Sequence, residues 1–418
     1  MQGGPQVVLS TARMLAYAGG SVGTGAFYAF NNFVLPTILK SFGAPDLLIG
    51  LLSSTRSIEG ALIQPTVGVV SDRAWSVLGR RRLFIAIGVP LSALFFVAGA
   101  FTTDLLGLAA VIVLFSIFFN VAVDPYTALL ADITPLHQRA FVSGLATAVQ
   151  LISSVGFLLL VVGASGGGGV PLWIYLAVAA IMLVSFGITV VGIRESKVLA
   201  GDHASTAGRL GRRQYLEALL EHRQAMRYLA TLFVYQFGLN AILPFLVLYI
   251  EVEIHESQQT GFALSAALLV LTALGAIIFG KVADRVGTRP ILALGWAMLA
   301  ASAVAGVVIT TLNELLFVVV LAGLGNGAAT AVNWPLLTAL IPPEKTGVFA
   351  GLKAAAESVA IPLSVIVAAE LFLPRLGYRG VFAMLAMSII VALLMLLRLV
   401  QVPRAAEAPV TTYTAQAR

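Results

Sequence analysis

The sequence contains no cysteine among its 418 residues and has little charge. The absence of cysteine excludes disulfide bonds and thiolate metal sites. Charged residues make up 11% of the chain, about half the share that is usual in a soluble domain. Hydrophobic residues make up 59%, and the mean hydropathy is +0.98. A chain of this composition is typical of an integral membrane protein.

Motifs of several enzyme and cofactor sites are also missing. No stretch matches the phosphate-binding pattern G-x-x-x-x-G-K-[ST], and no cluster of residues indicates a metal site or an activated nucleophile. We therefore expect no enzyme, no cofactor, no metal and no direct coupling to ATP. The four histidines all lie between apolar runs, so we expect none of them to carry a proton through a membrane.

Apolar runs of 18 or more residues recur along the whole chain, and each is long enough to cross a hydrocarbon core about 30 Å thick. Continuous runs predict helices, whereas barrel strands would alternate in polarity. The prediction is an all-α membrane protein with twelve transmembrane helices. Their expected limits are 12–39, 47–70, 83–103, 106–131, 139–163, 171–193, 228–250, 259–280, 290–311, 314–341, 347–372 and 378–400.

Basic residues predict the orientation of these spans. With both termini in the cytoplasm, only Lys40, Arg375 and Arg379 fall on the outer side, while Arg56 and Lys353 lie within spans. All other Lys and Arg then face inward, as the positive-inside rule requires. We expect a multi-pass protein of the cell (inner) membrane. The net charge of +6 reflects this orientation, and no nucleic-acid partner is needed to explain it.

The spans divide into two bundles of six. The expected parts are an N-terminal bundle (1–193), a basic cytoplasmic linker (194–227), a C-terminal bundle (228–402) and a cytoplasmic tail (403–418). The end of the linker, RRQYLEALLEHRQAMRYL, places apolar side chains on one helical face. That pattern is typical of an amphipathic helix on an anionic lipid surface, although an ordinary solvated linker has the same charge.

The two bundles also repeat each other in sequence. Gly68 and Asp72 correspond to Gly280 and Asp284, and PYTALLADITPLHQRAFVSGL (125–145) is echoed by PLLTALIPPEKTGVFAGL (335–352). Two homologous sets of helices are typical of a carrier with a central site between its halves. We therefore expect two pseudo-symmetric bundles that open alternately to either side.

At this point the residues resemble a known family. G-x-x-x-D-R followed by G-R-R, in QPTVGVVSDRAWSVLGRRRLF (64–84), resembles the signature loop of the major facilitator superfamily. The longer spacing before Gly79 resembles sucrose–proton symporters, and DPYTALLADITPLHQR resembles glycoside–cation symporters of the melibiose permease group. The resemblance implies the major facilitator fold and secondary transport by alternating access. The implied partners are a small solute, a coupling cation and membrane lipids, with the protein working as a monomer.

The resemblance also implies a set of gating residues. Asp72 would meet the N-terminal end of span eleven, near Thr346 and Gly347, when the inner gate is shut, because a helix N-terminus stabilises a carboxylate. Arg80 would pair with Asp132 at the inner end of span four. The residues expected to gate the carrier are Asp72, Arg73, Arg80, Asp132, Arg139, Asp284 and Arg285.

Five charged residues fall inside predicted spans: Arg56, Glu59, Asp124, Lys353 and Glu357. Charges in lipid are costly and mark functional cavities, so one reading places all five in a common cluster with a surplus carboxylate. A surplus carboxylate takes up a proton or attracts a cation. The alternative reading is local neutralisation, because the first two are spaced i,i+3 and the last two i,i+4.

The family pattern favours a proton over sodium as the coupling ion. RSIEGALIQP keeps the arginine and first acid of the glycoside symporters, but Gln64 stands where a second cation-binding acid is expected. Asp124, just before Pro125, resembles a sugar-contacting aspartate, whereas the acid expected on span one is replaced by Asn31 and Asn32.

Other side chains are expected to line the cavity by their positions on spans one, four, seven and ten. For each of them a hydrogen bond between helices is the competing explanation. The residues are Asn32, Tyr126, Asn240, Asn333 and Trp334.

Together these observations favour a secondary active transporter that moves a sugar or glycoside by proton-coupled symport. Two alternatives stay open: a facilitator-type exporter of drug or lipid cargo, and a non-transporting assembly factor on the same scaffold. The sequence alone assigns neither the solute nor the direction of transport.

Overall fold

The structure is a computed structural model that describes residues 9–54, 67, 76–134, 136–164, 170–195, 221–341 and 346–401. Within these residues the chain is helical apart from short connections and an isolated β-bridge between Ser76 and Gly79. Ten helices in the described part are long and apolar enough to cross a membrane.

The first bundle holds the described parts of the first six predicted spans, of which the second is described mainly over α3. Helix α1 packs on α7 and α8, and α5 packs on α6 and α8. Its elements are α1 (Thr11–Ala29), a π-helical segment (Phe30–Val34), α2 (Leu35–Ser41), α3 (Asp46–Ser53), α5 (Arg82–Ala98), a 3-10 turn (Gly99–Phe101), α6 (Leu105–Ile133), α7 (Leu136–Ala164) and α8 (Leu172–Gly192).

The second bundle holds the last six predicted spans. Helix α11 packs on α16 and α18, while α15 packs on α13 and α14. Its elements are α11 (Arg223–Ile242), a 3-10 turn (Leu243–Phe245), α12 (Leu246–Val252), α13 (Gln258–Val286), α14 (Thr288–Val308), α15 (Leu312–Thr338), α16 (Thr346–Val367), a π-helical segment (Ala368–Phe372), α17 (Leu373–Leu376) and α18 (Arg379–Leu399).

The predicted limits of spans three to twelve agree closely with these helices at most ends. Helix α11 begins at Arg223, before the predicted start of span seven at 228, and a second difference lies between spans eight and nine. The predicted spans stop at 280 and resume at 290, whereas α13 continues to Val286 and α14 begins at Thr288, with only Gly287 between them. The exposed, polar Lys281, Asp284 and Arg285 can remain helical beyond the apolar segment. The helix ends where Gly287 adopts φ +97°, a conformation that suits glycine.

Both π-helical segments have the same cause in the sequence. Phe30–Val34 ends two residues before Pro36, and Ala368–Phe372 ends two residues before Pro374. Proline lacks a backbone N–H, and its ring collides with the carbonyl four residues earlier in a regular α-helix. A π turn widens the helix at that point. The same solution therefore appears in the first and the eleventh span.

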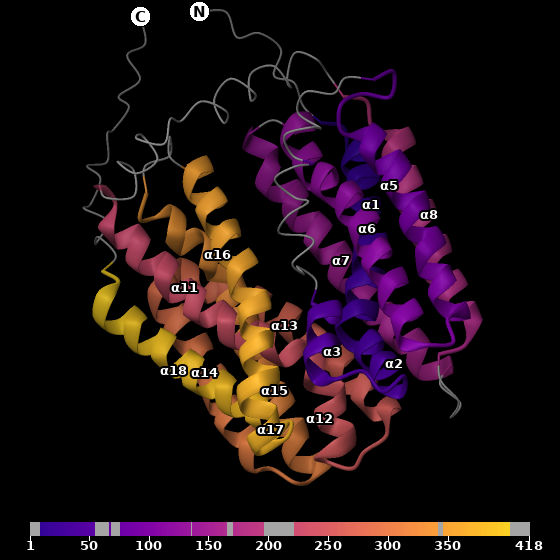
Figure 1. Ribbon diagram of the computed structural model, residues 1–418. Coiled ribbons are helices and arrows are strands. Elements are labelled where there is room, and N and C mark those ends of the chain that lie inside the picture. The colour runs from indigo at the N-terminus through magenta and orange to yellow at the C-terminus, as the bar shows by residue number, and fades with distance from the viewer. Residues whose placement is uncertain are drawn as a thin grey trace, which may run out of the picture.

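The two bundles touch where α3 meets the C-terminal part of α16. We call this end of the molecule, where α3 begins, the Asp46 end. There Gln259 Nε2 donates to the carbonyl of Val162 at 2.7 Å. A Cβ added to Gly50 would lie 2.2 Å from Val365 Cγ1, so only glycine lets α3 approach α16 this closely. Helices α2, α3, α12 and α17 gather at this end in Figure 1. We call the opposite end of the first bundle, at the start of α5 and the end of α6, the Asp132 end.

Candidate functional site

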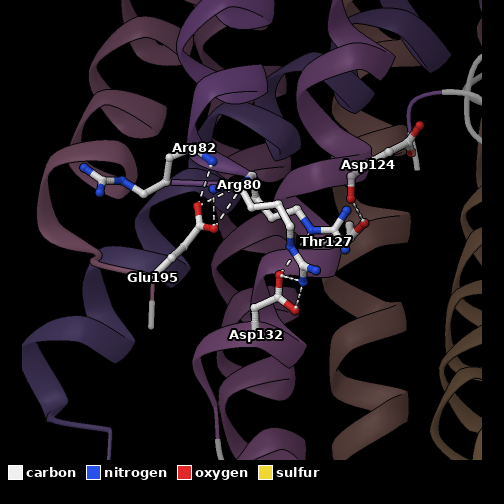
Figure 2. A network of polar contacts seen from close by, with 7 residues as sticks. Arg80, Arg82, Asp124, Thr127, Asp132 and Glu195 are labelled. Atoms are coloured by element: carbon white, nitrogen blue, oxygen red, sulfur yellow. Dashed lines mark hydrogen bonds and ion pairs between the residues drawn. The ribbon is translucent and has the colours of Figure 1, made fainter. Parts of the chain in front are cut away.

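A charge cluster fixes the start of α5 at the Asp132 end (Figure 2). Arg80 Nη2 lies 2.8 Å from both carboxylate oxygens of Asp132, and Arg81 Nε lies 3.1 Å from Asp132 Oδ2. All three residues are buried, so each charge depends on its partners for compensation. The contact between Arg80 and Asp132 is the one that the family resemblance predicts.

Glu195 completes this cluster from the end of α8. Its carboxylate accepts the backbone N–H groups of Arg80 at 2.7 Å, Arg81 at 3.0 Å and Arg82 at 2.9 Å. These amides lie at the start of α5 and in the two residues before it. A carboxylate there accepts from donors that have no partner within the helix and interacts favourably with the helix dipole. Gly79 makes the approach possible: its φ is +114°, and an added Cβ would lie 2.7 Å from Glu195 Oε1.

These contacts all lie inside the first bundle. They join the start of α5 to the ends of α6 and α8, and Arg82 Nε strengthens the junction by donating to the carbonyl of Val190 at 2.6 Å.

The structure describes only some of the other residues expected to gate the carrier. Asp72, Arg73 and the side chain of Arg139 lie outside the described residues. Asp284 and Arg285 are exposed on the last turn of α13. The gating role of the whole set stays a prediction.

A second polar network joins α11 to α16 in the other bundle. Lys353 forms an ion pair with Glu357 one turn along α16, which is the local pairing that the i,i+4 spacing allows. Gln236 Nε2 also donates to Glu357 Oε1, at 2.7 Å. Asn240 Nδ2 donates to the Gln236 carbonyl at 2.8 Å and reaches its side-chain oxygen at 3.2 Å. Glu357 is 9% exposed, so the network supports a carboxylate deep within the helices.

Two tyrosines extend hydrogen bonding from α11 to α15. The Tyr228 hydroxyl donates to the Asn333 carbonyl at 3.1 Å and lies 3.3 Å from its side-chain oxygen. The Tyr235 hydroxyl donates to Asn326 Oδ1 at 3.2 Å. Asn333 was expected to line the cavity, and its side-chain oxygen lies within hydrogen-bonding distance of the Tyr228 hydroxyl on α11. Trp334, beside it, is 39% exposed.

Three of the predicted site residues of the first bundle, Tyr126, Asp124 and Asn32, lie in the part of the chain that the structure describes. Tyr126 is buried, donates to the Tyr17 carbonyl at 2.7 Å and stacks on the Tyr17 ring. It therefore takes the interhelical role that was the competing explanation for its polarity. Asp124 is half-buried on α6, and Asn32 is half-buried in the π-helical segment. Arg56, Glu59 and Gln64 lie outside the described residues, so the five-charge cluster stays a prediction.

Sequence reasoning missed the contribution of Glu195. Glu195 follows Arg194 directly after a predicted span, so the sequence groups it with the basic linker and not with the start of a distant helix. The cap is formed across 115 residues of chain, and no local motif marks it. The one available signal was Gly79, since a glycine before a helix start permits close approach of another chain segment.

Replacing Glu195 by alanine should lower the stability of the first bundle. The change removes the acceptor of three backbone donors, and loss of a helix cap costs about 1–2 kcal/mol. Thermal unfolding in detergent, followed by tryptophan fluorescence, measures the change. Glu195→Gln, which keeps one acceptor oxygen, should lose less, and Glu251→Ala on the other bundle serves as the control. An unchanged melting temperature for Glu195→Ala would refute the capping role.

Comparisons with known proteins agree with this architecture. Sucrose transport protein SUT3 of Oryza sativa subsp. indica is 31% identical over 101 residues, which cover 24% of this chain and 20% of that protein. The chain thus matches only about a fifth of the length of this curated relative. A solved D-xylose-proton symporter superposes with a TM-score of 0.73 at 13% identity, covering 94% of this chain and 98% of that one.

A bacterial homologue of the human lysosomal transporter Spinster, solved in an inward-facing conformation, superposes with a TM-score of 0.66 at 14% identity over 92% of this chain and 93% of that one. At such identities these likenesses show the fold. The family model described as Major Facilitator Superfamily matches residues 17–267 and 228–416. With its helices in two bundles and this match over most of its length, the chain belongs to the Major Facilitator Superfamily of membrane transporters.

Proposed function

We propose that the protein is a secondary active transporter that moves a sugar or glycoside by proton-coupled symport. The observation that carries the proposal is the network in which Lys353 and Gln236, both partly buried, contact the buried Glu357 between α11 and α16. A carboxylate and an amine inside membrane-spanning helices are costly and mark a pathway for solute or ion. A carrier of a polar solute needs such groups in its pathway, whereas a carrier of a very apolar cargo does not.

The likeness to transport proteins of known cargo supports a sugar as the solute. A 101-residue stretch resembles a sucrose transport protein, and the fold resembles that of a D-xylose-proton symporter. Amide and carboxylate side chains such as those of Gln236, Asn240 and Glu357 bind hydroxyl groups by donating and accepting hydrogen bonds. They are therefore suited to a polyhydroxylated solute.

The proton is the proposed coupling ion because the sequence offers few acids for a sodium cage. Gln64 occupies the place of the second acid of the glycoside symporters. We assign the proton to Asp124, an acid inside α6 that lies directly before Pro125 and resembles a sugar-contacting aspartate of the glycoside symporters. Both termini face the cytoplasm in this proposal, as the distribution of Lys and Arg favours.

Uptake into proteoliposomes tests the proposed solute class. The purified protein is assayed with radiolabelled sucrose, D-xylose and an α-galactoside, with and without an imposed inward proton gradient. We expect at least one sugar to accumulate above its external concentration when the gradient is present. If none does, while a lipid or an apolar drug is moved outward, the exporter alternative replaces this proposal.

A further inference from the structure

Tyr378 joins the two bundles at the Asp46 end. It lies in the turn between α17 and α18 and is only 6% exposed. Its hydroxyl donates to Asp46 Oδ1, in the first bundle, at 2.9 Å. Lys40 Nζ lies 3.2 Å from the same carboxylate oxygen and 5.7 Å from the centre of the tyrosine ring. One carboxylate oxygen thus receives a donor from each bundle.

The first bundle prepares its half of this contact through helix ends. Asp46 is the first residue of α3, and Lys40 lies in the last turn of α2. A carboxylate at a helix N-terminus and an amine near a helix C-terminus are each favoured by the helix dipole. Their ion pair is partly exposed, and such a pair alone contributes little to stability. The hydroxyl and ring of Tyr378 therefore decide how strongly the bundles are joined here.

The second bundle holds Tyr378 firmly in position. The backbone N–H of Tyr378 donates to Glu253 Oε1 at 3.0 Å, and Arg379 Nε lies 3.0 Å from Glu253 Oε2. Gly377 precedes it with φ +60°, and an added Cβ there would lie 2.5 Å from Glu253 Oε1. The turn is thus shaped by glycine, closed by Glu253, and presents the tyrosine toward Asp46.

From this geometry we propose that Lys40, Asp46 and Tyr378 form a latch that holds the Asp46 end closed. The latch lies at the same end as the contact between Gly50 and Val365, where α3 and α16 meet. A carrier that works by alternating access must separate these helices once per cycle, so the contact of Tyr378 with Asp46 must then break. The latch sets the balance between the state with the Asp46 end closed and the state with it open. This role does not depend on which solute or ion is carried.

Cysteine labelling measures the opening of this end directly. The natural chain contains no cysteine, so Val365→Cys supplies a single thiol. Val365 is fully buried and faces Gly50 of the other bundle. The rate of maleimide labelling in proteoliposomes reports how often the helices part. Tyr378→Phe removes the hydroxyl donor and keeps the ring. We expect labelling to become about 3- to 10-fold faster, the effect of losing one hydrogen bond of ordinary strength to a partly exposed acceptor.

Tyr249→Phe is the matched control. The Tyr249 hydroxyl is also buried in the second bundle, but it donates to the Gly306 carbonyl at 2.8 Å within that bundle. The control should leave the labelling rate unchanged. Asp46→Asn provides a second test, since it removes the charge that Lys40 pairs with and keeps a side chain suited to a helix start; it should also accelerate labelling.

The latch is supported if both Tyr378→Phe and Asp46→Asn label faster while Tyr249→Phe does not. Unchanged rates in the two latch variants would overturn it. Equal acceleration in Tyr249→Phe would also overturn it, because general loosening of the bundle would then explain the result. The assay needs neither solute nor ion gradient, so its outcome is independent of the sugar and proton proposals.

Discussion

Replacing Asp124 by asparagine is expected to abolish gradient-driven accumulation of the solute while downhill exchange remains measurable. Asp124 lies half-buried in α6, directly before Pro125. A carboxylate inside a span is costly while charged, so it favours either a protonated form or a partner of opposite charge. Asparagine cannot take up a proton, and the energetic link between proton and solute is then lost.

Two uptake assays measure this change. Accumulation is followed under an inward proton gradient, and exchange is followed with solute on both sides and no gradient. Asp104→Asn is the matched control on the same helix, because Asp104 caps α6 by accepting the Gly107 N–H at 2.8 Å and asparagine caps equally well. Persistent accumulation in Asp124→Asn would show that another group carries the proton.

Replacing Lys353 by methionine is expected to destabilise the second bundle severely. The change removes the cation that is paired with the buried Glu357 carboxylate and leaves the hydrogen bond from Gln236 in place. Breaking a buried ion pair by removing one partner costs about 3–5 kcal/mol, because an uncompensated charge stays behind. The variant should show a lowered melting temperature and poor recovery from the membrane.

The double variant Lys353→Met with Glu357→Gln separates folding from transport. It removes both charges and keeps an acceptor oxygen for Gln236, so the melting temperature should return most of the way to that of the natural protein. Transport should stay absent if the pair serves the solute or ion pathway. Lys281→Met, at an exposed position of α13, controls for loss of a lysine. Full transport in the double variant would show that Lys353 and Glu357 have a structural role only.

Much of the fold could be predicted from the sequence because one physical requirement dominates it. A segment that crosses lipid must satisfy its backbone internally and be apolar over the membrane thickness. The limits of α6, α8 and α18 therefore follow from hydropathy. The end of α13 could not be predicted in this way, since a helix can continue into water until a residue such as Gly287 ends it.

The candidate site was less predictable, because contacts between helices depend on how their faces are oriented. The sequence shows that Tyr126 lies on span four, but not that its hydroxyl points at the carbonyl of Tyr17. The partner of Arg80 was predictable only through family resemblance. Glu195 and Tyr378 act on residues far away in the chain, and neither carries a local motif that announces such a role.

Proton movement during sugar addition tests proton-coupled symport directly. Proteoliposomes in sodium-free buffer contain the purified protein, and an external pH-sensitive dye reports proton uptake when each sugar is added. A transported sugar should raise the external pH, and Asp124→Asn should remove this signal. Sugar entry with no change of pH, or entry that requires sodium, would contradict proton-coupled symport.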